Sequence, residues 1–322
     1  MPRGHTEGTN KGNKTMPFDQ ASLNPKVFVK NSLLFLFSLA ALFLLYLPLR
    51  NIFLYSSYQV YYSYTVLIPF VSAYLLYKKR KSILSPAACS IKTGVAVMFA
   101  GLTLYGVGFF HFVAINQDNQ SSLLIFAALL FWIGSFVLLY GIRNFRKALF
   151  PLLFLGFMIP WPPFMIDKAI YLLQTGSTEL VDVIFTLMGW TFIREGFVFY
   201  MPEIGIEVGP ACSGIRSAIA LLITSVLAAW LFLDATWRRL LFFFSIFPLV
   251  ILKNGIRILT LYLLAIHVDK QILIGSPLHT ASGVLIFIPT LLLLGLFLWI
   301  LRKQEQAQRV ERINRQPEAS SQ

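Results

Sequence analysis

The sequence predicts an all-α polytopic membrane protein that crosses the bilayer about eight times. Three observations support this class. Hydrophobic residues make up 57% of the 322 residues and charged residues only 13%, and the mean hydropathy is +0.70. The apolar residues form runs long enough to span a bilayer, and basic residues gather between these runs. A soluble domain would have to expose too much of this apolar surface.

Eight apolar runs are candidates for membrane spans. They cover residues 31–49, 60–77, 93–113, 121–142, 148–165, 213–233, 240–267 and 280–301. The fifth run is the weakest, because Pro151, Pro160, Pro162 and Pro163 interrupt it. We expect a short or bent helix there that breaks at Ile159-Pro160-Trp161.

The basic residues orient these spans. The net charge is +13, but most Lys and Arg lie in short segments: before residue 31, over 78–92, at 143–147, at 238–239 and from 302 onward. This pattern is typical of loops on the cytoplasmic side, and with eight spans all five segments share one side. We therefore expect both termini inside and no nucleic-acid partner.

The ends of the chain are polar. Residues 1–30 begin with a stretch rich in Gly, Asn, Thr and Lys that lacks the early apolar core of a cleaved signal peptide, so we expect a disordered cytoplasmic tail. Residues 31–301 form the expected membrane-embedded domain, and 302–322 a basic cytoplasmic tail.

A long outer segment covers residues 161–211. Asp167, Glu179 and Asp182 interrupt apolar positions at helical spacing over 167–188, which predicts a helix lying on the outer interface. The apolar run 197–200 and the alternating run 203–208 flank Met201-Pro202, which predicts a short β-hairpin. The hairpin leads directly to Cys212.

The sequence gives no support for a disulfide, a metal site or a nucleotide-binding motif. Cys89 and Cys212 would lie on opposite sides of the membrane, so we expect no disulfide. The histidines lack the spacing of a metal site, and neither a phosphate loop nor a dinucleotide glycine pattern occurs, so we expect no cofactor. The absence of a repeat at a fixed period counts against a carrier built from paired halves.

Three polar residues fall at the outer ends of three spans. Cys212 opens the sixth span, and a helix N-terminus favours a thiolate there; the alternative is a small packing residue. Arg257 lies inside the seventh run, where a guanidinium costs roughly 2.5–3.5 kcal/mol; the alternative is an ion pair or a snorkelling side chain. His279 follows the helix-starting pair Ser276-Pro277, and it could also be incidental.

Together these residues suit acyl transfer. Cys212 would attack a carbonyl, His279 would move protons, and Arg257 would neutralise the thiolate or the oxyanion. We consider two rival functions. A transporter or channel could use Arg216 and Arg257 to bind an anionic substrate, and a scaffold for polysaccharide export would use the polar cluster structurally.

The three motifs carry a resemblance to a known family. Ala211-Cys212-Ser213-Gly214-Ile215-Arg216-Ser217, then Asn254-Gly255-Ile256-Arg257, then His279 at the start of the last span resemble the exosortase/archaeosortase family of membrane transpeptidases. The resemblance extends over about residues 35–297. It implies Cys212, Arg257 and His279 as catalytic residues and Ser213, Arg216 and Asn254 as substrate-binding residues.

The same resemblance implies the partners and the location. Members look like enzymes of the bacterial inner membrane, with the active site on the periplasmic face. Their substrates are exported proteins with a C-terminal signal made of a short motif such as Pro-Glu-Pro, an apolar helix and a basic cluster. The protein is cleaved through a thioester and passed to an acceptor nucleophile, which stays unknown here. Membrane lipids surround the enzyme, and no cofactor is implied.

Overall fold

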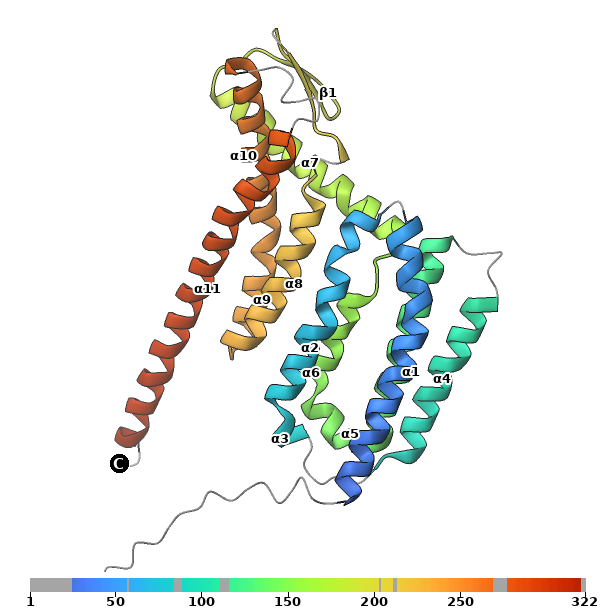
Figure 1. The fold of residues 1–322 in the computed structure, drawn as a ribbon. Helices are drawn as coiled ribbons and strands as arrows, with labels where there is room; N and C mark the ends of the chain where they lie inside the picture. Colours follow the sequence, from blue (N-terminus) through green and yellow to red (C-terminus); the bar gives the residue numbers. More distant parts are fainter. Residues whose placement is uncertain are drawn as a thin grey trace, which may run out of the picture.

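The fold is a bundle of long helices with a small sheet at one end (Figure 1). The computed structural model describes residues 25–56, 58–83, 89–110, 116–202, 204–210, 213–268 and 277–319. Within these, the elements in chain order are α1 (Pro25–Tyr55), η2 (Gln59–Val66), α2 (Leu67–Lys78), α3 (Arg80–Ile83), α4 (Ile91–Phe110), α5 (Gln117–Lys147), α6 (Leu149–Phe154), η4 (Leu155–Met158), α7 (Pro163–Leu187), β1 (Ile193–Glu195), β2 (Val198–Tyr200), β3 (Gly205–Glu207), α8 (Ile215–Phe232), α9 (Thr236–Phe244), α10 (Ile246–His267) and α11 (Pro277–Ala319).

The chain is a multi-pass membrane protein. Among the described residues, six helices are long and apolar enough to cross a membrane, or seven if a bent pair is one span. The expected span over 60–77 is divided between the 3-10 helix η2 and the 12-residue α2, which is too short to qualify alone. The count of eight therefore stays a prediction, and six to seven is what length and composition support.

The first half of the bundle packs by close helix contact. Helices α1, α4 and α5 lie side by side (Figure 1). A Cβ added to Gly101 of α4 would lie 2.6 Å from the backbone nitrogen of Phe131, and one on Gly134 of α5 would lie 2.5 Å from that of Met98. Small residues that let helix backbones approach are a common way to pack helices in lipid, where burial of apolar surface offers little gain.

The chain bends sharply after the fifth apolar run. Helix α6 and η4 end at Met158, and α7 begins at Pro163 after a bend of 87°. The expected break at residues 159–161 falls inside this gap. Proline at the first position of α7 explains its start, because that position needs no hydrogen-bond donor. The outer helix expected over 167–188 thus runs from Pro163 to Leu187.

A three-stranded antiparallel sheet follows α7, in the order β1-β2-β3. Strands β2 and β3 fall within the two runs expected to pair, with Phe199 opposite Ile206. Strand β1 was not expected from the sequence; it pairs with β2, with Arg194 opposite Phe199. Side chains of α7, the sheet and α10, among them Phe185, Phe199 and Tyr262, form a shared apolar core. The sheet is therefore fixed to both helices.

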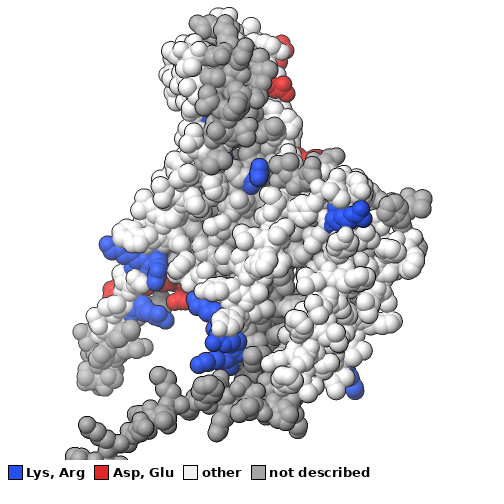
Figure 2. Space-filling model, in the orientation of Figure 1, with Lys and Arg blue, Asp and Glu red and all other residues white. Residues whose placement is uncertain are grey.

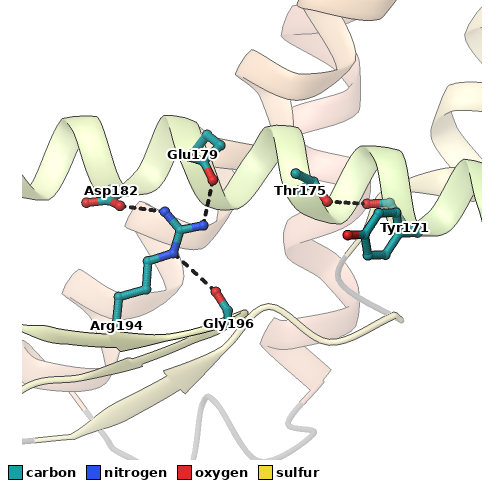
Figure 3. A network of polar contacts seen from close by, with 6 residues as sticks. All are labelled: Tyr171, Thr175, Glu179, Asp182, Arg194 and Gly196. Atoms are coloured by element: carbon teal, nitrogen blue, oxygen red, sulfur yellow. Dashed lines mark hydrogen bonds and ion pairs between the residues drawn. The ribbon is translucent and has the colours of Figure 1, made fainter.

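An ion-pair network also ties the sheet to α7 (Figure 3). Arg194 of β1 donates to Glu179 Oε1 at 2.6 Å and to Asp182 Oδ2 at 2.5 Å. Its Nε donates to the carbonyl of Gly196 at 3.1 Å. These hydrogen bonds raise the pKa of Arg194, and the hydrogen bond from Arg194 lowers the pKa of Glu179. Two of the three acidic residues that interrupt the amphipathic stretch, Glu179 and Asp182, thus hold the sheet.

The basic segments meet at the opposite end of the bundle. Lys147 Nζ of α5 donates to the carbonyl of Ser82 at 3.0 Å, and Tyr140 donates to Asn31 near the start of α1 at 2.5 Å. Arg238 of α9 pairs with Glu305 of α11 at 3.2 Å. Figure 2 shows most of the visible Lys and Arg side chains toward this end and acidic side chains beside the sheet. This distribution agrees with the expected charge pattern, and the cytoplasmic side of this end stays a prediction.

The first and last helices extend past the expected limits of the membrane domain at residues 31 and 301. Helix α1 begins at Pro25, and residues 1–24 lie outside the described part. Helix α11 continues as one helix to Ala319, so the basic segment from residue 302 is helical up to that residue. Contacts of Glu305 with the backbone nitrogens of Asp234 and Ala235, at 3.0 and 2.7 Å, give that extension a partner that hydropathy does not reveal.

Candidate active site

A left-handed glycine turn opens α8. Gly214 has φ +74°, a conformation that L side chains rarely adopt, and it precedes the first helical residue, Ile215. Ser213 is fully buried, and its Oγ accepts from the backbone nitrogen of Ile215 at 3.4 Å. Ser217 Oγ donates to the carbonyl of Gly214 at 2.8 Å. The two serines of the motif therefore hold the turn from both sides.

Helix α10 crosses α7 closely beside this turn. A Cβ on Gly255 would lie 2.7 Å from Leu180 Cδ2, and one on Gly176 would lie 2.8 Å from Ile251 Cδ1. The two glycines thus allow the helices to approach at the level where α10 carries its polar residues. A larger side chain at either position would have to displace Leu180 or Ile251, whose side-chain ends occupy the space.

Asn254 of α10 links three segments. It has no exposed surface, and its Nδ2 donates to Ser177 Oγ of α7 at 2.9 Å. Its Oδ1 lies against the glycine turn, because a Cβ on Gly214 would come within 3.2 Å of that oxygen. Among the described residues this buried oxygen has no hydrogen-bond donor. An acceptor of this kind is costly unless some group donates to it.

Two cationic residues flank Asn254 along α10. Lys253 is 4% exposed, and its Nζ donates to Ser217 Oγ. Arg257, one turn further along the helix, is 8% exposed. A hydrogen-bond chain therefore runs from Lys253 through Ser217 to the carbonyl of Gly214. The turn that follows the motif cysteine is held by two consecutive residues of α10.

Helix α8 is long enough to cross a bilayer, because its 18 residues span about 27 Å, close to the thickness of the hydrocarbon core. Lys253 is bonded to Ser217, and it therefore lies beside the first turn of α8. Helix α10 continues beyond this level, where Ile258 and Tyr262 join the core under the sheet.

The structure brings together some of the predicted site residues and not others. Ser213, Asn254 and Arg257 are buried, and Ser213 and Asn254 both lie beside the Gly214 turn. Arg216 is exposed on the first turn of α8. His279 lies in the first turn of α11, and its side chain is outside the described part. Cys212 also lies outside the described residues.

Sequence reasoning undervalued Lys253 and missed Ser177 and Ser217 as partners. Lys253 is absent from the predicted site residues, but it is buried and bonded to α8. Its spacing of four residues from Arg257 puts both cations on one helix face, which was a usable signal. The sequence contains no such signal for Ser177, because the role of Ser177 depends on how α7 crosses α10.

Fold and cluster together define a class: a multi-pass membrane protein with a buried polar centre at one end of an apolar bundle. The particular family follows from comparison with known sequences. Residues 56–298 match the sequence model of the transmembrane exosortases, and since this is more than half of the chain, the protein belongs to that family. The suspected resemblance is thereby confirmed, and it makes the protein a membrane transpeptidase at the family level, with exported proteins as substrates. No curated relative and no solved structure matches the chain.

Proposed function

We propose that the protein is a cysteine transpeptidase that cleaves a C-terminal sorting signal from exported proteins at the outer face of the bacterial inner membrane. Family membership supports the reaction class. The observation that carries the proposal is the turn at Gly214, held by Asn254, Lys253 and two serines. A fixed turn next to a motif cysteine suits a nucleophile that must meet a peptide bond in one geometry.

Cys212 is the proposed nucleophile. Consecutive Cα atoms are about 3.8 Å apart, so chain connectivity alone keeps residue 212 within about 8 Å of Gly214. The Cys212 thiolate attacks the carbonyl carbon of the scissile bond, and collapse of the tetrahedral intermediate releases the C-terminal peptide as an amine. The remaining thioester is then resolved by water or by an acceptor nucleophile, which restores the thiol.

Arg257 and His279 are the proposed partners. A buried guanidinium near the turn is suited to stabilise a thiolate or the oxyanion of the intermediate, and loss of such a donor commonly costs about 10²–10³ in rate. His279 opens α11, and it is proposed to give the leaving amine its proton. Arg216, exposed at the start of α8, and Ser213 and Asn254 are proposed to bind substrate.

The test uses a reporter protein whose C-terminus carries a short motif, an apolar helix and a basic cluster. Co-expression with the enzyme should shorten the reporter, and Cys212→Ala should abolish this while leaving the enzyme in the membrane. Cys89→Ser is the matched control and should process normally. If the Cys212→Ala enzyme shortens the reporter at the normal rate, the nucleophile is wrong, and a transporter that uses the same cations becomes the better explanation.

A further inference from the structure

A buried glutamine of α7 holds the end of the strand that leads into the candidate active site. Gln174 is 7% exposed, and its Nε2 donates to the backbone carbonyl of Val208 at 2.8 Å. Val208 directly follows β3 and has no exposed surface. Its nitrogen donates to the carbonyl of Phe197 at 2.9 Å, which extends the pairing of β2 and β3 by one step. The backbone of Val208 is therefore fixed on two sides, by the sheet and by α7.

The sheet is attached to α7 without this hydrogen bond. An aromatic core that includes Phe185 and Phe199 joins the sheet to α7, and so do the ion pairs of Arg194 (Figure 3). The carbonyl that Gln174 binds lies beyond Glu207, the last residue of β3. The hydrogen bond from Gln174 therefore acts mainly on the segment that follows the sheet.

The segment after Val208 is short and closed by a hydrogen bond. Cys212 is four residues further along the chain. The nitrogen of Ser213 donates to the carbonyl of Pro210 at 3.1 Å, so the two described residues that flank positions 211 and 212 are bonded to each other. Only Gly209 separates Val208 from Pro210, whose ring fixes its φ. A displacement of Val208 is therefore transmitted to the residues on either side of the motif cysteine.

The same face of α7 also holds the other side of this segment. Ser177 follows Gln174 by three residues, so the two buried side chains share a helix face. Ser177 accepts a hydrogen bond from Asn254, whose Oδ1 lies against the Gly214 turn. The segment before Cys212 is thus anchored to α7 directly, and the turn after it is anchored through Asn254.

We propose that Gln174 is a positioning residue, which holds the segment before Cys212 so that the thiol meets the scissile carbonyl in one geometry. This inference rests on the proposed function, and the bonds that form and break are those given there. Loss of the Gln174 donor leaves a buried carbonyl without its partner, and the strand end then shifts toward another donor. A shift of about 1 Å at a reacting atom can lower a rate about 10²-fold, so the effect belongs to kcat.

Hydrogen exchange tests the anchor without any reaction. The probe is the peptide covering residues 205–216 in the full-length enzyme in detergent. Gln174→Met keeps the side-chain length but removes the donor, and it should raise amide exchange in this peptide about tenfold, as expected for one lost hydrogen bond. Thr175→Val is the matched control, because Thr175 donates to the carbonyl of Tyr171 within α7 at 2.9 Å (Figure 3), and it should leave exchange unchanged. Equal exchange in the unsubstituted and Gln174→Met enzymes would overturn the anchor.

Reporter cleavage tests the positioning role. Gln174→Met should lower kcat about tenfold to a hundredfold and change KM less than about twofold, whereas Thr175→Val should keep both values. Gln174→Glu is a second variant of the same shape, whose carboxylate faces the Val208 carbonyl without a donor, and it should lose at least as much kcat. Unchanged exchange in peptides from α4 and α5 shows that these variants are folded.

The outcomes separate this inference from the proposed function. Normal cleavage by Cys212→Ala would overturn the proposed function and leave the exchange result standing. With Cys212→Ala inactive, a normal kcat in Gln174→Met despite raised exchange would overturn the positioning role. So would a loss that appears in KM alone, because Gln174 would then act on substrate binding and not on the geometry of the thiol.

Discussion

The two halves of the molecule bury polar groups in different ways. Within the described residues of the first half, the buried polar groups that form hydrogen bonds are neutral, whether they bond within a helix, as Ser135 does to Phe131, or between helices, as Gln120 does to the carbonyl of Gly108. In the second half a buried cation also bonds between helices, Lys253 to Ser217, next to the buried amide of Asn254, which donates to Ser177. The buried charged residues of the described chain, Arg238, Lys253 and Arg257, all lie in the second half.

This difference indicates that the first half of the bundle is structural and that the second half carries the candidate active site. A hydroxyl bonded within its own helix costs little in lipid and reports nothing about function. The buried cations Lys253 and Arg257 cost free energy that packing alone does not explain. The buried amide of Asn254 lies next to the Gly214 turn, as does Ser217, to which Lys253 donates. We therefore expect substitutions in the first half to act on stability and substitutions near the turn to act on the reaction.

The largest effect is expected from Arg257. Arg257→Ala should lower the rate of reporter cleavage by about 10²–10³, because it removes the buried charge that is proposed to stabilise the thiolate or the oxyanion. Arg216→Ala is the matched control, since Arg216 is exposed on α8, and it should weaken substrate binding by a few-fold only. Initial rates against reporter concentration check both variants. Equal losses in maximal rate would contradict the distinction between the two arginines.

Glycine substitutions test whether the first half of the bundle acts on stability alone and the second half also acts on the reaction. Gly101→Val in the first half and Gly255→Val in the second should each lower the thermal unfolding temperature, since overpacking costs about 1–3 kcal/mol. Gly101→Val should keep normal activity per folded molecule, and Gly255→Val should lose it, because α10 moves relative to the turn. Gly106→Ala, with open space around it, should be neutral. Equal specific activities for the two valine variants would contradict the different roles assigned to the two halves.

Asn254 is expected to have an intermediate effect. Asn254→Ala removes the bond to Ser177 and the group that faces Gly214, and it should cost about 1–3 kcal/mol of stability while lowering the cleavage rate. Ser177→Ala removes only the first contact, so the comparison isolates the contribution of Oδ1. Thermal unfolding and reporter cleavage are measured side by side. A rate for Asn254→Ala no lower than that for Ser177→Ala would show that Oδ1 has no role in the reaction.

The smallest effect is expected at the sheet. Arg194 lowers the pKa of Glu179, so this ion pair stabilises the fold above the ordinary Glu value of about 4.5, and the contribution is lost as the pH falls below it. Limited proteolysis after β1 should therefore increase as the pH approaches 4. In Arg194→Met the same protease sensitivity should be present already at neutral pH and change less on acidification. An unchanged pH profile in that variant would contradict the role of the pair.

The sequence predicted more of the membrane core than of the site. Hydropathy located the long helices, and the proline cluster located the bend before α7. Strand β1 was not predicted because a three-residue strand with Arg194 at its centre is too short to show an alternating pattern. The pairing of Asn254 with Ser177 and of Lys253 with Ser217 was also out of reach. The first pair depends on the crossing of α7 and α10, where Gly176 and Gly255 lie, and the second depends on how α10 packs against α8.

The proposed function depends on a thioester that Cys212 forms with the sorted protein at the end of the bundle that carries the sheet. Its most direct test is intact-mass measurement of the purified enzyme after a short incubation with the reporter. We predict an adduct with the mass of the shortened reporter that hydroxylamine removes, that persists in Cys89→Ser and that is absent in Cys212→Ala. An adduct of the same mass in the Cys212→Ala enzyme would contradict the account.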